Sequence, residues 1–148
     1  MTLAKKSILL KLIALILVFS LIIPSTVSAT TPSNVQPYAS KYLSLYNTYI
    51  CDVGSGNIQI WYEVMGTGRM DEIGVLSIEL YEVKSNGSLS WVKTFFHENY
   101  SSMLVSNDNY HYSYVSYQGS SSKTYKAYVC IWAGKDGNGD TRYMWATE

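Results

Sequence analysis

Every second residue from 58 to 64 is Ile, Tyr or Val, and the residues between them are Gln, Trp and Glu. This period of two limits what the chain can fold into. A period of two is typical of a half-buried β-strand, because successive side chains point to opposite faces of a sheet. We therefore expect this segment to turn one face toward a core and the other outward. The inward face would hold Ile58, Ile60, Tyr62 and Val64, and the outward face Gln59, Trp61 and Glu63.

The aromatic composition favours the same structure. All 14 tyrosines follow residue 37, and they are joined by four tryptophans. Aromatic and β-branched side chains suit a pleated surface, whereas runs of Ala, Leu, Glu and Lys that would favour helix are nearly absent. The sequence predicts an all-β protein.

Turn signals divide the chain into about seven predicted strands. The turn Ser85-Asn-Gly-Ser88 predicts a hairpin, and a further pair is expected between 109–117 and 123–133. Residues 97–107 are interpreted as a loop, and 41–53 as a strand, with a short helix as the alternative. The expected strands are 41–53, 58–64, 73–84 (Leu76, Ile78 and Leu80 inward), 89–96, 109–117, 123–133 and 141–146.

Seven short strands over roughly 110 residues are typical of an antiparallel two-sheet sandwich, of the immunoglobulin or fibronectin kind. We assign this β-sandwich domain to residues 38–148. Residues 30–37 are polar and contain two prolines, and we interpret them as a linker.

The first 29 residues are interpreted as a cleavable secretory signal peptide. Three lysines precede an apolar run over 12–23, Pro24 ends that run, and small residues follow up to Ala29. The alternative is an uncleaved membrane anchor, but an apolar run of twelve residues is short for a bilayer. We therefore expect an extracellular protein that meets the membrane only during export.

Removal of this peptide changes the charge of the chain. Three lysines leave while all 11 acidic residues stay, so the mature chain carries a net charge of −3. An acidic surface of this kind does not attract phosphate groups, which argues against nucleic acid as a partner.

Four segments carry a resemblance to a known family: Gln59–Gly68, Met70–Gly74, Lys126–Asp136 and Gly139–Tyr143. Together they resemble an uncharacterised family, a domain of unknown function, of small secreted proteins of Gram-positive bacteria. The resemblance extends over about residues 38–147. It implies a secreted bacterial single-domain protein and supplies no activity, cofactor or catalytic residue.

The two cysteines, Cys51 and Cys130, could form a disulfide, because export permits one. Such a bridge would close a long loop and stabilise a small domain by about 4.5 kcal/mol. The alternative is that both are small buried thiols.

Asp136, Asn138 and Asp140 have the alternating spacing that opens many calcium loops. The rest of the calcium pattern is missing, since Thr141 replaces the expected glycine and Thr147 the expected glutamate. A glycine-rich hairpin turn is the simpler interpretation, and Ca²⁺ the alternative; no other cofactor is expected.

Tyr110, Tyr112 and Tyr114 share one side of a predicted strand. A row of three aromatic side chains more often belongs to a core or covers a sheet edge than binds a ligand. If this side faces water, together with Trp91, it would offer a flat aromatic surface for sugar rings or for an extended peptide.

No motif for a nucleophile, for a metal enzyme or for phosphate binding is present, so we expect a protein that is not an enzyme. The preferred hypothesis is an extracellular binding module that uses exposed Tyr and Trp to hold a carbohydrate or cell-wall polymer. The alternative is a structural or interaction protein, such as a self-associating subunit or a secreted antagonist with a protein partner.

Overall fold

Residues 40–147 are described by the structure, a computed structural model, and form one antiparallel sheet of six strands. No helix in this range is long and apolar enough to cross a membrane. The predicted signal peptide and linker lie outside the described residues. The strands are Leu43–Asp52 (β1), Asn57–Val83 (β2), Leu89–Phe96 (β3), Leu104–Gln118 (β4), Thr124–Lys135 (β5) and Asn138–Ala146 (β6).

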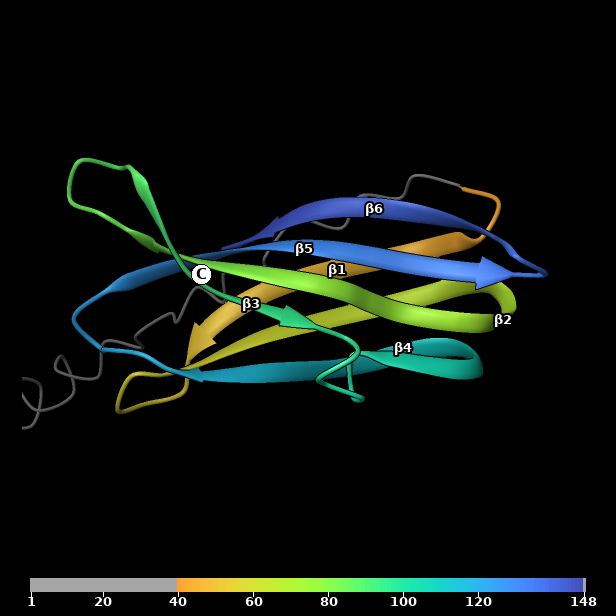
Figure 1. The fold of residues 1–148 in the computed structure, drawn as a ribbon, viewed down its shortest axis with the longest axis horizontal. Helices are drawn as coiled ribbons and strands as arrows, with labels where there is room; N and C mark the ends of the chain where they lie inside the picture. The colour runs from red at the N-terminus through yellow and green to blue at the C-terminus, as the bar shows by residue number, and fades with distance from the viewer. Residues whose placement is uncertain (1–39, 148) are drawn as a thin grey trace, which may run out of the picture. The chain divides into compact units, whose positions relative to one another are not determined.

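The sheet is organised by β2, which pairs with four of the other strands. Its first half pairs with β1 on one side and with β4 on the other. Its second half pairs with β5 and β3, and β6 extends the sheet beyond β5. Figure 1 shows β2 running to one end of the domain, bending there and running back. The sheet is therefore strongly curled, like half of a barrel.

The bend of β2 is held by contacts around Thr67. Its amide donates a hydrogen bond to the carbonyl oxygen of Tyr42 (2.9 Å), and its hydroxyl donates to that of Lys41 (2.8 Å). The backbone passes so close to itself that a Cβ added to Gly66 would lie 2.7 Å from the carbonyl oxygen of Gly68. A glycine is needed where two backbone segments approach this closely.

The hydrophobic core lies on the concave face of the curled sheet. The alternation predicted for 58–64 is confirmed, because all four apolar side chains of that face are buried. They meet buried apolar side chains that alternate in the same way along β1 and β5, together with Val115 of β4. The largest fully buried side chains are Tyr62, Phe95, Leu43, Ile58, Ile60 and Ile73.

The prediction of an all-β antiparallel fold is confirmed, while its finer detail is corrected. The segments 58–64 and 73–84 are one bent strand, so there are six strands instead of seven, and they belong to one sheet instead of two. Residues 43–52 form a strand, not a helix. The predicted pairing of 109–117 with 123–133 is wrong, because both segments pair with β2.

The inward face predicted for 73–84 also changes at one residue. Ile78 and Leu80 are fully buried, but Leu76 is only half-buried, and Val75 is fully buried in its place. The register between β2 and β5 shifts between Val75 and Ser77, which interrupts the alternation at this point.

Candidate functional site

The outer face of β1, β2 and β4 carries a group of aromatic side chains that we call the aromatic ladder: Tyr49, Trp61, Tyr112 and Tyr114. These residues point outward because their neighbours along each strand point into the core. Ile50, Ile60 and Val115 are buried and lie side by side across the three strands. The next position in each strand then places Tyr49 opposite Trp61, and Trp61 opposite Tyr114.

The rings of the aromatic ladder stack on one another across the strands. The centroids of Tyr49 and Trp61 are 6.0 Å apart with nearly parallel planes, at 6°. Trp61 also contacts Tyr112 at 5.1 Å and Tyr114 at 4.4 Å. Each such aromatic pair contributes about 0.5–1.5 kcal/mol beyond its buried area. Trp61 is the centre of the ladder, and the rings hold one another in fixed positions.

Polar groups lie between and beside these rings. The hydroxyls of Tyr49 and Tyr112 share a hydrogen bond of 2.8 Å, and the indole nitrogen of Trp61 donates to the side-chain oxygen of Gln59 at 3.1 Å. The Tyr110 hydroxyl donates to the Glu63 carboxylate at 3.0 Å. The surface therefore combines apolar ring edges with hydroxyl, amide and carboxylate oxygens.

The hydroxyls of Tyr49 and Tyr110 stay protonated at neutral pH. Burial raises the pKa of Tyr49, and its hydrogen bond with Tyr112 raises it further. Burial, followed by the hydrogen bond to Glu63, also raises the pKa of Tyr110. Each hydroxyl is therefore neutral and can both donate and accept a hydrogen bond.

The structure places the three tyrosines predicted from the sequence on the solvent side of β4. Tyr110, Tyr112 and Tyr114 are 39%, 46% and 42% exposed. Trp91 does not join them. It lies on β3, opposite Tyr81 in the second half of β2, and is 62% exposed.

A second group of aromatic side chains covers the outer face of β2, β5 and β6, near Trp91. Tyr128 stacks on Tyr143, with centroids 5.6 Å apart at 13°, and contacts Trp145 at 4.9 Å. Trp145 in turn lies 5.7 Å from Tyr81. We call Tyr81, Tyr128, Tyr143 and Trp145 the second aromatic cluster, and it provides a comparison surface of similar composition.

Sequence reasoning missed Tyr49 and Trp61 as parts of the candidate site. Trp61 occupies an outward position of the clearest alternating strand, and this is the signal that pointed to it. Its contact with Tyr49 and with β4 depends on the register between distant strands, which no local pattern contains.

Asp136, Asn138 and Asp140 lie in and after the turn between β5 and β6, and each makes a separate structural contact. The Asp136 amide donates to the carboxylate of Asp71 at 2.7 Å, and the Asn138 side chain donates to the carbonyl oxygen of Asp136 at 3.0 Å. Asp140 accepts a hydrogen bond from the amide of Tyr42 at 3.1 Å. Within residues 40–147 no three His, Cys, Asp or Glu side chains converge as metal ligands. These contacts match the hairpin interpretation of the segment.

Cys51 and Cys130 are free thiols in the structure, so the disulfide alternative is not formed. Both side chains lie on the outward-facing side of their strands, Cys51 beside Gln59 and Cys130 between Ser77 and Tyr143. Cys51 lies in the half of the sheet that carries the aromatic ladder, whereas Cys130 lies in the other half. Burial raises the pKa of the Cys130 thiol, which keeps it protonated.

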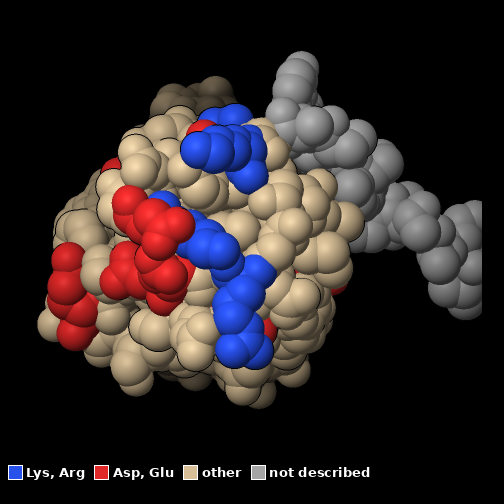
Figure 2. Space-filling model, turned by 90° about the vertical axis from the view of Figure 1, so that its right-hand side faces the viewer, with Lys and Arg blue, Asp and Glu red and all other residues tan. Residues whose placement is uncertain are grey.

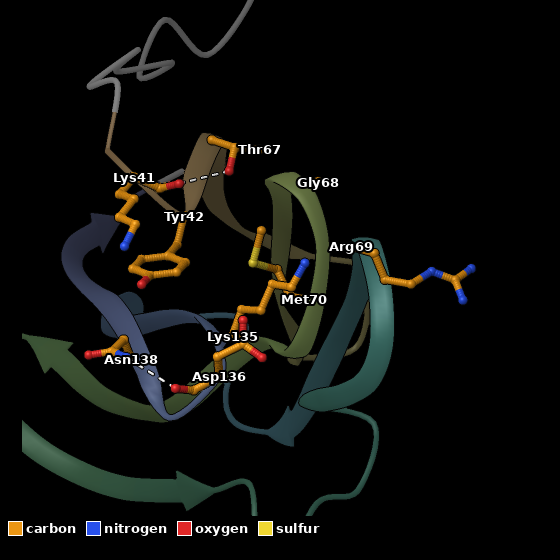
Figure 3. Close-up of a pocket in the computed structure, with 9 residues that line it drawn as sticks. All are labelled: Lys41, Tyr42, Thr67, Gly68, Arg69, Met70, Lys135, Asp136 and Asn138. Atoms are coloured by element: carbon orange, nitrogen blue, oxygen red, sulfur yellow. Dashed lines mark hydrogen bonds between the residues drawn. The ribbon is translucent and has the colours of Figure 1, made fainter.

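A hollow of about 370 Å³ lies at the end of the domain where β2 bends and β5 turns into β6. In Figure 3, Lys41, Tyr42 and Lys135 surround it, with Asp136 at its base, while the Arg69 side chain points away. The Lys41 ammonium lies 5.1 Å from the centroid of the Tyr42 ring. Figure 2 shows Lys and Arg side chains running across this end beside a group of Asp and Glu. The lining of the hollow carries more positive than negative side chains, with Lys41, Arg69 and Lys135 against Asp136.

The histidines and carboxylates make local contacts instead of an acid–base pair. His111 shares a hydrogen bond of 2.7 Å with the carbonyl oxygen of Ser102, and His97 lies 3.3 Å from Glu98. Glu82 lies between two lysines, Lys84 at 2.7 Å and Lys123 at 2.8 Å, and these hydrogen bonds lower its pKa.

The aromatic ladder is therefore the arrangement whose chemistry points most directly to a ligand. Its rings stack on one another, its hydroxyls take part in hydrogen bonds, and polar acceptors lie beside it. Comparison of the chain with known proteins finds no matching family model, no matching curated protein and no matching solved structure.

Proposed function

We propose that this chain is a secreted bacterial binding protein that holds an extracellular carbohydrate on the aromatic ladder. The predicted signal peptide in residues 1–29 supports the extracellular location, as does the resemblance to secreted proteins of Gram-positive bacteria. The observation that carries the binding role is the row of stacked, outward-facing rings, two of them exposed, with polar groups beside it.

A sugar ring matches this combination of groups. It has C–H groups that pack on aromatic side chains, and hydroxyls around its rim that need donors and acceptors. The ladder presents ring edges, the outer faces of its end rings, tyrosine hydroxyls and the Glu63 carboxylate. Because the rings already support one another, little side-chain freedom is lost on binding.

The charge of this surface favours a neutral polymer. The ladder strands contain no lysine or arginine between 43 and 52, between 57 and 66, or between 109 and 118. Glu63 is an acidic group on the same face. An anionic polymer would meet no cation here, so we propose a neutral cell-wall or plant-type glycan as the ligand.

The proposal can be tested by retention of the protein on insoluble neutral glycans such as chitin and cellulose. Tyr112→Ala and Tyr114→Ala should each weaken retention about tenfold, because each removes an aromatic contact of about 0.5–1.5 kcal/mol and one hydroxyl. Tyr143→Ala in the second aromatic cluster and Trp91→Ala are the matched controls and should bind as the unchanged protein does.

The result that would overturn the proposal is equal retention of the ladder variants and the unchanged protein. Thermal unfolding of each variant shows that a loss of binding does not come from a loss of folding. We also propose that the protein does not cleave the glycan, so release of soluble reducing sugar would contradict the proposal.

A further inference from the structure

The strand β4 has one hydrogen-bonding edge that no other described segment covers. Residues 110–118 pair with β2 along their whole length on one side. Within residues 40–147, no backbone hydrogen bond reaches these residues from the other side. The Tyr110 amide donates to the Asp108 carboxylate at 3.4 Å. The other peptide groups of this segment that face away from β2 have no partner among the described residues, which leaves the edge able to accept another strand.

The uncovered edge also lacks the features that usually prevent strand addition. Residues 109–118, Asn-Tyr-His-Tyr-Ser-Tyr-Val-Ser-Tyr-Gln, contain no Lys, Arg, Asp, Glu, Pro or Gly. Their register with β2 runs without a bulge from Gln118 to Tyr110. The edge strand β3, in contrast, carries Lys93 and a register shift opposite β2, and β6 carries Asp140 and Arg142. Natural edge strands are protected by charges, prolines and bulges of these kinds.

The aromatic ladder ends at this edge. Tyr112 and Tyr114 contact Trp61 on one side, and both remain more than 40% exposed. A strand added beside β4 would place its outward side chains next to these two rings. The added strand is favoured if those side chains are aromatic, because cross-strand aromatic pairs stabilise a sheet.

We propose that β4 pairs with β4 of a second copy of this chain, antiparallel and around a two-fold axis at Ser113. This segment is complementary to itself in that register. Tyr112 of each copy lies opposite Tyr114 of the other, and Asp108 lies opposite Gln118, so no like charges meet. The two sheets would join into a single sheet in which the ladders of both copies form one continuous row.

This pairing is separate from carbohydrate binding but has a consequence for it. A two-fold interface of this kind closes on itself, so it gives a dimer and not a fibre. The joined ladders would double the length of the binding surface, which strengthens attachment to a polymer with repeating units.

The proposal is tested by sedimentation velocity over a wide range of protein concentration. The chain is expressed in full and purified as the host processes it. We expect a species of twice the mass of the processed chain, and we expect Ser116→Lys to convert it to a single-copy species. This change adds a charge to the uncovered edge at an exposed position. Ser106→Lys is the matched control, because Ser106 is an exposed serine of β4 outside the uncharged segment, and it should leave the dimer intact.

A cysteine at the two-fold axis tests the register. In a Cys51→Ser background, Ser113→Cys should form a disulfide between copies on mild oxidation, since residue 113 lies opposite its own counterpart. Ser116→Cys, opposite Tyr110, should not. A single-copy protein at every concentration, an open series of larger species, or attachment of a different protein at this edge would each overturn the proposal. None of these measurements contains a glycan, so failure here is distinct from failure of carbohydrate binding.

Discussion

A single backbone position, Gly74, lets β2 run against the segment that precedes β4. Gly74 has a φ of 145°, and a Cβ at this position would lie 2.2 Å from the carbonyl oxygen of Met103. The next residue, Val75, donates its amide hydrogen bond to that same oxygen at 2.7 Å. Any side chain here would have to push the two backbone segments apart.

We expect Gly74→Ala to lower the free energy of unfolding by about 3 kcal/mol, through the strained dihedral angle and the close contact. Gly87→Ala is the control, because Gly87 also has a positive φ, 79°, but a Cβ added there would meet no other segment within 4 Å. Gly87→Ala should lower the free energy of unfolding by about 1 kcal/mol. Urea unfolding of both variants gives the comparison, and equal losses would show that the close contact is unimportant.

Tyr62 is the largest fully buried side chain and carries a polar group into the core. Its hydroxyl donates a hydrogen bond of 2.9 Å to the carbonyl oxygen of Ser102, and His111 binds the same oxygen. Burial raises the pKa of Tyr62 above its usual value of 10.0, because the ionised form would be poorly solvated.

The raised pKa of Tyr62 predicts a loss of stability at alkaline pH. Below pH 10 the hydroxyl is neutral in both states and its stabilising effect is complete. As the pH rises toward the folded pKa, only the unfolded chain releases the proton, so the free energy of unfolding falls. Tyr62→Phe should cost about 1 kcal/mol at neutral pH and show a smaller alkaline decline. Denaturant unfolding at neutral pH and above pH 10 measures both, and an identical decline in the variant would contradict this role.

At the scale of elements, the start of β1 is fastened to β6 by a carboxylate. Asp140 accepts a hydrogen bond from the amide of Tyr42 at 3.1 Å. A hydrogen bond from the Ser40 side chain, followed by that of the Tyr42 amide, lowers the pKa of Asp140. Its ionised form therefore helps to keep these two strands together.

The lowered pKa of Asp140 gives a direct spectroscopic prediction. The stabilising effect is complete above the unfolded value of 3.8 and is lost as the pH falls through the lower folded pKa. The amide proton shift of Tyr42, followed by NMR, should therefore titrate with a midpoint below 3.8. Asp140→Asn should remove this titration while the exposed Asp108→Asn leaves it unchanged. A midpoint at or above the usual value would show that the hydrogen bond does not favour the ionised form.

Most strands were predictable from local patterns, whereas their partners were not. The alternation at 58–64 and the Asn-Gly turn at 86–87 located β2 and the β2–β3 hairpin correctly. The bend between Met65 and Met70 contains Gly66 and Gly68, which are typical of a turn between two strands, so the sequence predicts two strands where the structure has one. Adjacent segments of sequence are expected to pair, but β5 uses its two edges for β2 and β6, and β4 pairs with β2 instead.

The candidate site was predictable in the same partial way. Alternation alone places Tyr110, Tyr112 and Tyr114 on one side of a strand. Whether that side faces water depends on the inward position of Val115, which meets Ile60 across the sheet. The contact with Trp61 requires the register between strands that are some fifty residues apart, and only the folded sheet contains it.

At the scale of the whole molecule, no described covalent bridge ties the strands together. Cys51 and Cys130 are free thiols, and the domain is held by its core and its strand pairing. Cys51 is half-buried on β1, whereas Cys130 is buried on β5 beside Tyr143.

We therefore expect the melting temperature of the protein to be the same with and without a reducing agent. In the folded protein, a thiol reagent should modify Cys51 faster than Cys130, because Cys130 is less exposed and its pKa is raised. In denaturant both should react. An intact mass two hydrogens lower than that of the free-thiol chain, and a melting temperature that falls on reduction, would contradict the free-thiol state.

The central position of β2 determines how this domain can acquire its structure. Because β2 pairs with β1, β3, β4 and β5, its pairing is complete only when β4 and β5, which lie far along the chain, have been synthesised. Folding dominated by such distant pairings is slow, on the order of milliseconds to seconds. The sheet is therefore complete only after β6, at its edge, has been synthesised and has paired with β5.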